Sequence, residues 1–195
     1  MTIQLIAVGA SLGGLHALEV LLAGLPRNFP VPVAIVQHRY KASDQKLRAA
    51  LQQYCALVVT EPQDKEEIVP GYIYLAPADY HLMVEVKNDT ASCPSFSLSV
   101  DAPVTYARPS IDVLFETAAD TYAEKLIGVL LTGANHDGTH GMAKIKARGG
   151  KTVVQEPSTA ACSTMPKAAI AAGVADKVLL LADIAPYLVK ICHLF

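Results

Sequence analysis

Short apolar runs recur along this chain, and the segments between them carry helical patterns. Residues Ile3–Val8 form the first run, and leucines then recur at helical spacing from Leu15 to Leu25. Pro26 ends that pattern. A strand buried on both faces of a sheet is apolar throughout, whereas a strand with a solvent face alternates. The pattern therefore predicts a buried strand followed by a helix.

The same alternation continues through the next thirty or so residues. Residues Val31–Gln37 predict a second strand, and a helix capped by Ser43 or Asp44 extends to about Tyr54. Residues Leu57–Thr60 predict a third strand. Strands separated by helices favour a parallel sheet with right-handed crossovers. The predicted fold class is α/β: a doubly wound, mainly parallel sheet in a Rossmann-like three-layer arrangement.

The middle of the chain has a different pattern. The runs "GYIYLAP", "HLMVEV" and "SFSLSV" are short, β-rich and separated by turn residues, which predicts an antiparallel hairpin or meander at one edge of the sheet. The segment "RPSIDVLF" then predicts a helix with Ser110 as its N-cap. The strand "LIGVLLTG", a helix from Thr139 to Arg148, the strand "KTVVQ", the helix "PKAAIAAG" and the strand "KVLLL" follow. We expect one domain over residues 1–195.

Composition narrows the class of protein. Of the 195 residues, 52% are hydrophobic and 17% are charged, which predicts a large buried core. The net charge of -2 gives no basic footprint for nucleic acid. The four cysteines are too scattered for a zinc or redox motif, and neither a signal peptide nor an apolar stretch of about 20 residues is present. We therefore expect a cytoplasmic protein without membrane insertion.

Three polar side chains follow three of the predicted strands. Ser11 follows the first strand, His38 the second, and Asp137 comes shortly after "LIGVLL". In open α/β sheets, ligands bind beyond the carboxyl ends of the parallel strands, near a switch in strand order. Ser, His and Asp are the residue types of a nucleophilic hydrolase triad. The sequence thus predicts a hydrolase site at this edge of the sheet.

The turn after the first strand has more than one interpretation. Residues 9–13, "GASLG", fit the G-x-S-x-G pattern of a nucleophile elbow, in which a sharp turn exposes the serine hydroxyl. Free amides at the start of the following helix can stabilise an oxyanion. A dinucleotide fingerprint fails, because Ser11 replaces its second glycine and no acidic residue closes the second strand. A plain strand–helix turn remains the alternative to an elbow.

The segment "HDGTH" raises the question of a metal. His136 and His140 are four residues apart and could share a helical face, as in the zincins. However, Asp137 stands where a zincin has Glu, and Gly138 weakens a helix through this stretch. We interpret the segment as a loop and helix cap, and we predict no metal and no organic cofactor.

Taken in order, these motifs resemble the catalytic domain of the chemotaxis protein-glutamate methylesterases, the CheB family. The resemblance covers nearly the whole chain through "VGASLGG", "IVQH", "YLAPADYHLMV", "RPSIDVLF", "VLLTGANHDGTHGM" and "QEPSTAACSTMPKAAIAAGVADKVLLLADIA". It implies that Ser11 is the nucleophile, His38 the general base and Asp137 the orienting carboxylate. It also implies a serine hydrolase that removes methyl esters from γ-glutamyl side chains on the cytoplasmic helices of chemoreceptors, and that deamidates glutamines by the same chemistry.

Further residues are candidates for the oxyanion site and the pocket. The resemblance places backbone amides around Leu12 and Ala134 at the oxyanion, with Gly13 beside them. Met165 is a candidate for the rim of the cleft, and a contact in the core is an equal alternative for it.

The chain also departs from the family pattern. Leu12 stands where the family commonly has Thr, and Ala134 and Asn135 stand where it has Met and Gly. These changes motivate an alternative function, that of a degenerate module that binds receptors or signalling partners without turnover. The chain begins at the catalytic strand, so we expect no receiver domain within it. A receiver or methyltransferase domain, on the same or another chain, is a candidate partner.

Overall fold

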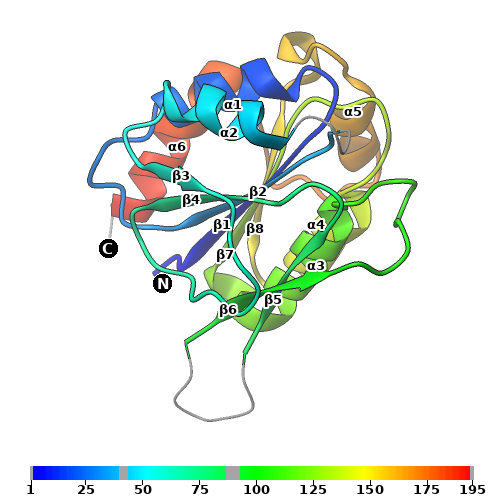
Figure 1. Ribbon diagram of the computed structural model, residues 1–195. Coiled ribbons are helices and arrows are strands. Elements are labelled where there is room, and N and C mark those ends of the chain that lie inside the picture. The colour runs from blue at the N-terminus through cyan, green and yellow to red at the C-terminus, as the bar shows by residue number, and fades with distance from the viewer. Residues whose placement is uncertain (1, 40–43, 87–92, 194–195) are drawn as a thin grey trace.

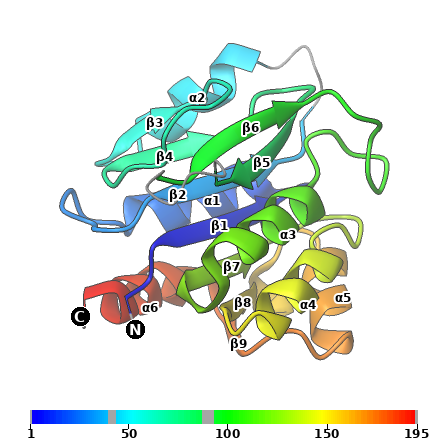
Figure 2. The same cartoon turned by 90° about the horizontal axis from the view of Figure 1, so that it is seen from below.

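The computed structural model describes residues 2–39, 44–86 and 93–193 of the chain. Seven strands lie in one sheet: β1 (Leu5–Ala10), β2 (Val33–Gln37), β3 (Val58–Thr60), β4 (Tyr72–Leu75), β7 (Leu126–Leu130), β8 (Lys151–Gln155) and β9 (Lys177–Leu179). Their spatial order is β3-β4-β2-β1-β7-β8-β9, and every neighbouring pair is parallel; Figure 1 shows the sheet, and Figure 2 labels each of these strands. The prediction of a mainly parallel sheet is confirmed.

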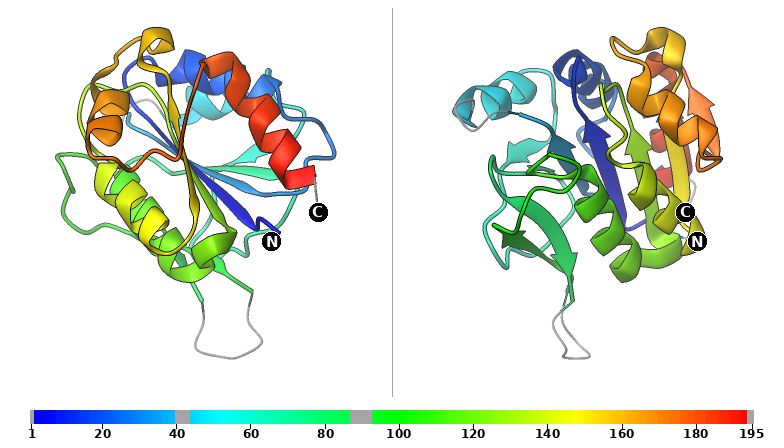
Figure 3. Two further views of the ribbon diagram at one scale, coloured as in Figure 1. Left: turned by 180° about the vertical axis from the view of Figure 1, so that it is seen from behind. Right: turned by 90° about the vertical axis from the view of Figure 1, so that its right-hand side faces the viewer.

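Helices cover both faces of this sheet (Figures 2 and 3). On one face lie α1 (Gly14–Ala23), α2 (Asp44–Gln52) and α6 (Leu181–His193), and on the other α3 (Ile111–Tyr122), α4 (Thr139–Ala147) and α5 (Thr164–Ala171). Two short 3-10 helices, η2 (Ala123–Lys125) and η3 (Pro157–Thr159), link elements at the surface. The predicted three-layer, doubly wound α/β architecture is therefore the observed one.

The antiparallel part is arranged differently from the prediction. Among the strands of the described residues, β5 (His81–Glu85) and β6 (Ser95–Ser99) are the one antiparallel pair, and they form a separate two-stranded sheet packed against α3 rather than an edge of the main sheet. The run expected as a third antiparallel strand is β4, which lies inside the parallel sheet with Ile73, Tyr74 and Leu75 buried. A four-residue run is too short to reveal whether both of its faces are covered.

Helix α6 was not among the elements expected from the sequence. Ile184, Leu188 and Cys192 recur every four residues and pack onto the apolar cluster under α1. Pro186 lies inside this helix, where proline normally argues against helix. Tertiary burial of the apolar stripe outweighs that preference. Among the described residues, no helix combines the length and apolarity required to cross a membrane.

The carboxyl end of strand β1 lies where the strand order of the sheet reverses. The strand lies between β2 and β7, with all six residues buried. The chain moves outward from β1 through β2 to β4 and β3, and then returns to the other side of β1 as β7. This reversal is the switch in strand order at which open α/β sheets bind ligands, and Ser11 directly follows β1 there.

Close packing between β1 and α3 depends on Gly9. A Cβ atom added at Gly9 would lie 2.3 Å from Cγ2 of Ile111, the first residue of α3. We expect Gly9→Ala to lower the free energy of unfolding by about 1–3 kcal/mol, because the side chain would overpack a closed contact. Urea unfolding measures this effect. In the double variant with Ile111→Ala the two effects should be clearly non-additive, and simple additivity would contradict the contact.

Candidate active site

Ser11 sits on a sharp turn between β1 and α1. Its amide donates to the carbonyl of Thr132 at 2.9 Å, and the amide of Gly14 donates back to the carbonyl of Ser11 at 2.8 Å. Gly13 has φ +80°, a conformation that glycine adopts without steric cost, and a Cβ there would lie 2.4 Å from Cβ of Ala161. The turn thus projects Ser11 from the carboxyl end of the sheet, as the elbow interpretation predicts.

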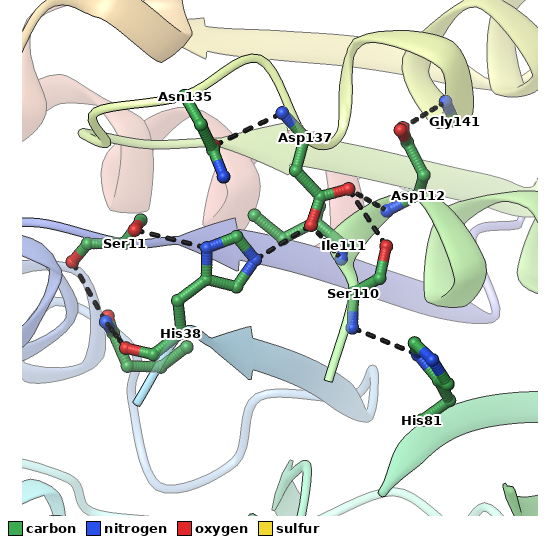
Figure 4. A network of polar contacts seen from close by, with 10 residues as sticks. Ser11, His38, His81, Ser110, Ile111, Asp112, Asn135, Asp137 and Gly141 are labelled. Atoms are coloured by element: carbon green, nitrogen blue, oxygen red, sulfur yellow. Dashed lines mark hydrogen bonds and ion pairs between the residues drawn. The ribbon is translucent and has the colours of Figure 1, made fainter. Parts of the chain in front are cut away.

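His38 connects Ser11 to Asp137 (Figure 4). Its Nδ1 lies 3.2 Å from Oγ of Ser11, and its Nε2 lies 2.7 Å from Oδ2 of Asp137. A carboxylate can only accept a hydrogen bond, so the ring proton belongs on Nε2. Nδ1 then carries the free lone pair, and it faces the serine hydroxyl. The three residues predicted from the strand ends are therefore brought together in one hydrogen-bonded chain.

Asp137 is fully buried and is surrounded by donors. Besides His38, it accepts from Oγ of Ser110 at 2.9 Å, from the amide of Ile111 at 2.8 Å and from the amide of Asp112 at 3.0 Å. Burial by itself raises the pKa of this carboxyl, but the hydrogen bonds from His38 and the two amides outweigh it, and the pKa of Asp137 is lowered. Asp137 is therefore an anion that also caps the start of α3.

A second buried carboxyl, Asp112, lies behind the first. Its Oδ1 accepts from the amide of Gly141 in α4 at 2.7 Å, which ties α3 to the helix after Asp137. Burial raises the pKa of Asp112 to about 6 against the lowering effect of the Gly141 amide, and the nearby charge of Asp137 adds to the increase. The pKa values of these two neighbouring acids are thus moved in opposite directions: that of Asp137 is lowered, and that of Asp112 is raised to about 6.

Gln37 is a site residue that the sequence analysis did not identify. Its Nε2 donates to the carbonyl of Ser11 at 2.9 Å and to the carbonyl of His38 at 2.8 Å, so one buried amide fixes both backbone segments. A Cβ at Gly14 would lie 1.9 Å from Oε1 of Gln37, so the amide fits only because residue 14 is glycine. The only indication in the sequence was a polar residue ending an otherwise apolar strand.

Ser11 and His38 open into a cleft of about 960 Å³. Three of the four predicted pocket residues line it: Leu12, Gly13 and Ala134. The side chain of Leu12 is exposed, and the backbone amides of Leu12 and Ala134 have no acceptor within the described ranges. These two N–H groups are therefore available to a ligand in the cleft.

Met165 is not in the cleft. It is fully buried, and its sulfur and methyl group occupy the space beside Gly133, where a Cβ would lie 2.4 Å from Cε of Met165. The expectation that it forms part of the rim is therefore corrected to a core contact beneath the loop that leads to Asp137. The apolar environment under α5 accounts for this position.

The metal interpretation of "HDGTH" has no support. His136 and His140 are both exposed, while Asp137 between them points inward to His38. Across the described parts of the chain, no three or more His, Cys, Asp or Glu side chains gather as metal ligands would. Asn135, a departure from the family pattern, accepts a hydrogen bond from the amide of Asp137 at 3.2 Å and stabilises the turn.

Fold and site geometry together are those of an α/β serine hydrolase. The family model described as CheB methylesterase matches residues 6–188, and the chain belongs to the CheB methylesterase family. The crystal structure of the Thermotoga maritima CheB methylesterase catalytic domain superposes with a TM-score of 0.93 at 34% identity, covering 98% of this chain and all of that one.

Relatives of two lengths match this chain. A Leptospira interrogans protein is 45% identical over 98% of this chain and 96% of its own length. The protein-glutamate methylesterase/protein-glutamine glutaminase of Thermotoga maritima is 36% identical over 90% of this chain, but over only 50% of its own length. A Carboxydothermus hydrogenoformans relative with the same type of name is 39% identical over 93% of this chain and 53% of its own length.

The raised pKa of Asp112 makes stability depend on pH. Its folded pKa of about 6 exceeds the ordinary aspartate pKa of 3.8, so the folded state binds the proton more tightly, and the protein loses stability as pH rises from 3.8 to about 6. Asp112→Asn keeps an oxygen for the Gly141 amide and removes the charge. We expect this variant to gain about 2 kcal/mol relative to wild type between about pH 4 and about pH 8, measured by urea unfolding.

Asp120 provides the matched control on the same helix. The pKa of Asp120 is lowered, first by its hydrogen bond to Lys144. Asp120→Asn should therefore change relative stability in the opposite direction as pH rises, and only slightly because the group is exposed. A pH-independent difference between wild type and Asp112→Asn would contradict the assignment of Asp112.

Proposed function

We propose that this chain hydrolyses methyl esters of γ-glutamyl side chains on chemotaxis receptors and deamidates glutamine side chains at the same site. The observation that carries the proposal is the hydrogen-bonded chain from Ser11 through His38 to Asp137, in a cleft of a CheB-family domain. The proposed catalytic residues are Ser11 as nucleophile, His38 as general base and Asp137 as orienting carboxylate.

The proposed proton transfers follow the hydrogen bonds of the site. Nδ1 of His38 takes the proton of Ser11 as Oγ forms a bond to the ester carbonyl carbon. The tetrahedral intermediate then expels the methoxy group, which leaves as methanol with the proton from His38. Water attacks the acyl-enzyme in the same way: His38 takes a proton from the water, and Ser11 leaves with it. Asp137 stays ionised throughout and stabilises the imidazolium.

The free amides of Leu12 and Ala134 are the proposed oxyanion donors. Both are backbone groups, so Leu12 and Ala134 supply them whatever side chains stand there. A side-chain hydroxyl at position 12 would be a third donor, and losing one donor costs on the order of 10²–10³ in rate. This loss is the basis of the degenerate-module alternative. The intact hydrogen-bonded chain favours turnover over that alternative.

The substrate is proposed to be a glutamyl side chain on a cytoplasmic receptor helix, reached by an open cleft with an apolar rim. Leu12 is 62% exposed, Leu15 is 43% exposed, and Tyr106 is fully exposed at the tip of a tight turn beside the cleft. Arg108 also lines the cleft, but its guanidinium is already bound to Asp79. We further propose that the chain acts in the cytoplasm as a single catalytic domain, with a receiver or methyltransferase domain as a candidate partner.

Methanol release from a methyl-esterified receptor fragment tests the function. We expect Ser11→Ala to reduce release by ~10⁴-fold or more, because the proposed acyl-enzyme forms on the Oγ that this variant lacks. Ser163→Ala is the matched control: that serine is the N-cap residue before α5 and makes no side-chain cap bond, so this variant should retain full release. Equal release from wild type and Ser11→Ala would contradict the mechanism. Absence of release from wild type would favour the degenerate module.

The apolar rim predicts a difference between folded and small substrates. Tyr106→Ala should raise KM for a receptor fragment by about tenfold, because a fully exposed aromatic ring would become buried against the receptor helix. Turnover of a short glutamyl methyl ester peptide should stay unchanged, since the small substrate does not reach the rim. Tyr54→Ala serves as the control, because Tyr54 is exposed but does not line the cleft. A parallel loss on both substrates would contradict the docking role.

A further inference from the structure

Ser110 occupies the N-cap position of α3, yet its hydroxyl does not cap the helix. An N-cap serine normally accepts a hydrogen bond from an amide two or three residues later. Here Oγ of Ser110 is fully buried and donates to Oδ1 of Asp137 at 2.9 Å, while the amides of Ile111 and Asp112 also donate to that carboxylate. Ser110 thus occupies the predicted N-cap position, but its hydroxyl donates to Asp137 instead of accepting from an amide of the helix.

His81 supports Ser110 from the opposite side (Figure 4). It is 2% exposed, its Nδ1 accepts from the amide of Ser110 at 3.2 Å, and its Nε2 lies 3.1 Å from the carbonyl of Ala102. An amide N–H can only donate and a carbonyl can only accept, so the ring proton lies on Nε2. One imidazole therefore bridges the two ends of the segment 103–109.

The bridged segment forms one wall of the cleft. Its residues Thr105, Tyr106 and Arg108 line the cleft together with Ser11 and His38. Val104 and Ala107 pair through two backbone hydrogen bonds, so the tip is a tight turn, and its base is closed by His81. The wall of the cleft and the support of Asp137 thus meet at Ser110.

We propose that Ser110 and His81 are positioning residues for the hydrolytic reaction: Ser110 orients Asp137 directly, and His81 fixes Ser110 and the cleft wall together. The inference rests on the triad of the proposed function. With Oδ1 of Asp137 held by the Ser110 hydroxyl and the Asp112 amide, Oδ2 is directed at Nε2 of His38. Neither residue touches the reacting atoms.

Removal of the Ser110 hydroxyl should change the electrostatic interaction between Asp137 and His38. The carboxylate would lose one of its donors, so more of its negative charge would act on His38 and favour the protonated ring. The acid limb of the pH–rate profile should therefore move to higher pH. The other titratable groups at Asp137 are Asp112 and, on α4 beside Asp112, His140, with His81 behind Ser110. All of them remain in place in a Ser110 variant.

The test compares Ser110→Ala with Thr117→Val across the pH range. Thr117 is a hydroxyl residue of the same helix, but its Oγ1 bonds to the carbonyl of Val113 and the amide of Val84, away from the triad. The readout is the second-order rate of labelling of Ser11 by a fluorophosphonate, which needs no receptor substrate. We expect Ser110→Ala to label about tenfold more slowly with its acid limb moved to higher pH, and Thr117→Val to keep the wild-type profile.

A second variant covers the case in which Ser110→Ala fails to fold. His81→Phe keeps an aromatic ring and removes both bridging nitrogens, and we expect roughly threefold to tenfold slower labelling with a shift in the same direction. Profiles of Ser110→Ala and His81→Phe that match Thr117→Val would overturn the proposal. A slower rate with an unmoved acid limb would also overturn it, because a purely structural role gives that result.

These outcomes are separable from failure of the proposed function. Labelling of Ser11 without methanol release from receptor fragments would reject the methylesterase function. The pH profiles of labelling would still decide whether Ser110 and His81 are positioning residues. No labelling of wild-type Ser11 would reject the triad, and the positioning roles with it.

Discussion

Asp137 holds a negative charge where no solvent reaches it, and the surrounding fold supplies the compensation. The start of α3 provides two amides and one hydroxyl, and His38 provides a ring N–H at 2.7 Å. An uncompensated buried charge costs several kcal/mol, so the segment after β7, the end of β2 and the start of α3 must keep one relative position. Gly9 and Gly138 permit this approach, since a Cβ at either would collide with Ile111.

Much of the fold and the three central site residues could be predicted because apolar runs reveal where strands end. Parallel strands bring their carboxyl ends to one edge, so Ser11, His38 and Asp137 fall together although 99 residues separate the last two. The chain belongs to the CheB family that its motifs resemble. That resemblance supplied the expected role of each of the three residues. The catalytic roles themselves stay predictions that the hydrogen-bonded chain supports.

Residues that act through polar contacts made by the fold could not be predicted. Gln37 looks like the end of a strand, and only the structure shows its amide between Ser11 and His38. His81 has no partner near it in sequence, because Ser110 lies 29 positions away. From the sequence, a position of Met165 at the rim of the cleft and one in the core were equal alternatives, and the packing of α5 places it in the core. Strand β4 was wrongly assigned to the antiparallel part, because its short apolar run resembles those of β5 and β6 and does not reveal which of the two sheets it joins.

The central claim is that Asp137 fixes the His38 ring so that Nδ1, not Nε2, is the base facing Ser11. Nitrogen-15 NMR of labelled protein reads this directly, with His38→Gln used to assign the signals. In unprotonated His38, the structure predicts a proton on Nε2 and a bare Nδ1, and the preference should weaken in Asp137→Asn. A proton on Nδ1 in the wild-type ring would leave Ser11 without a base and would contradict the account.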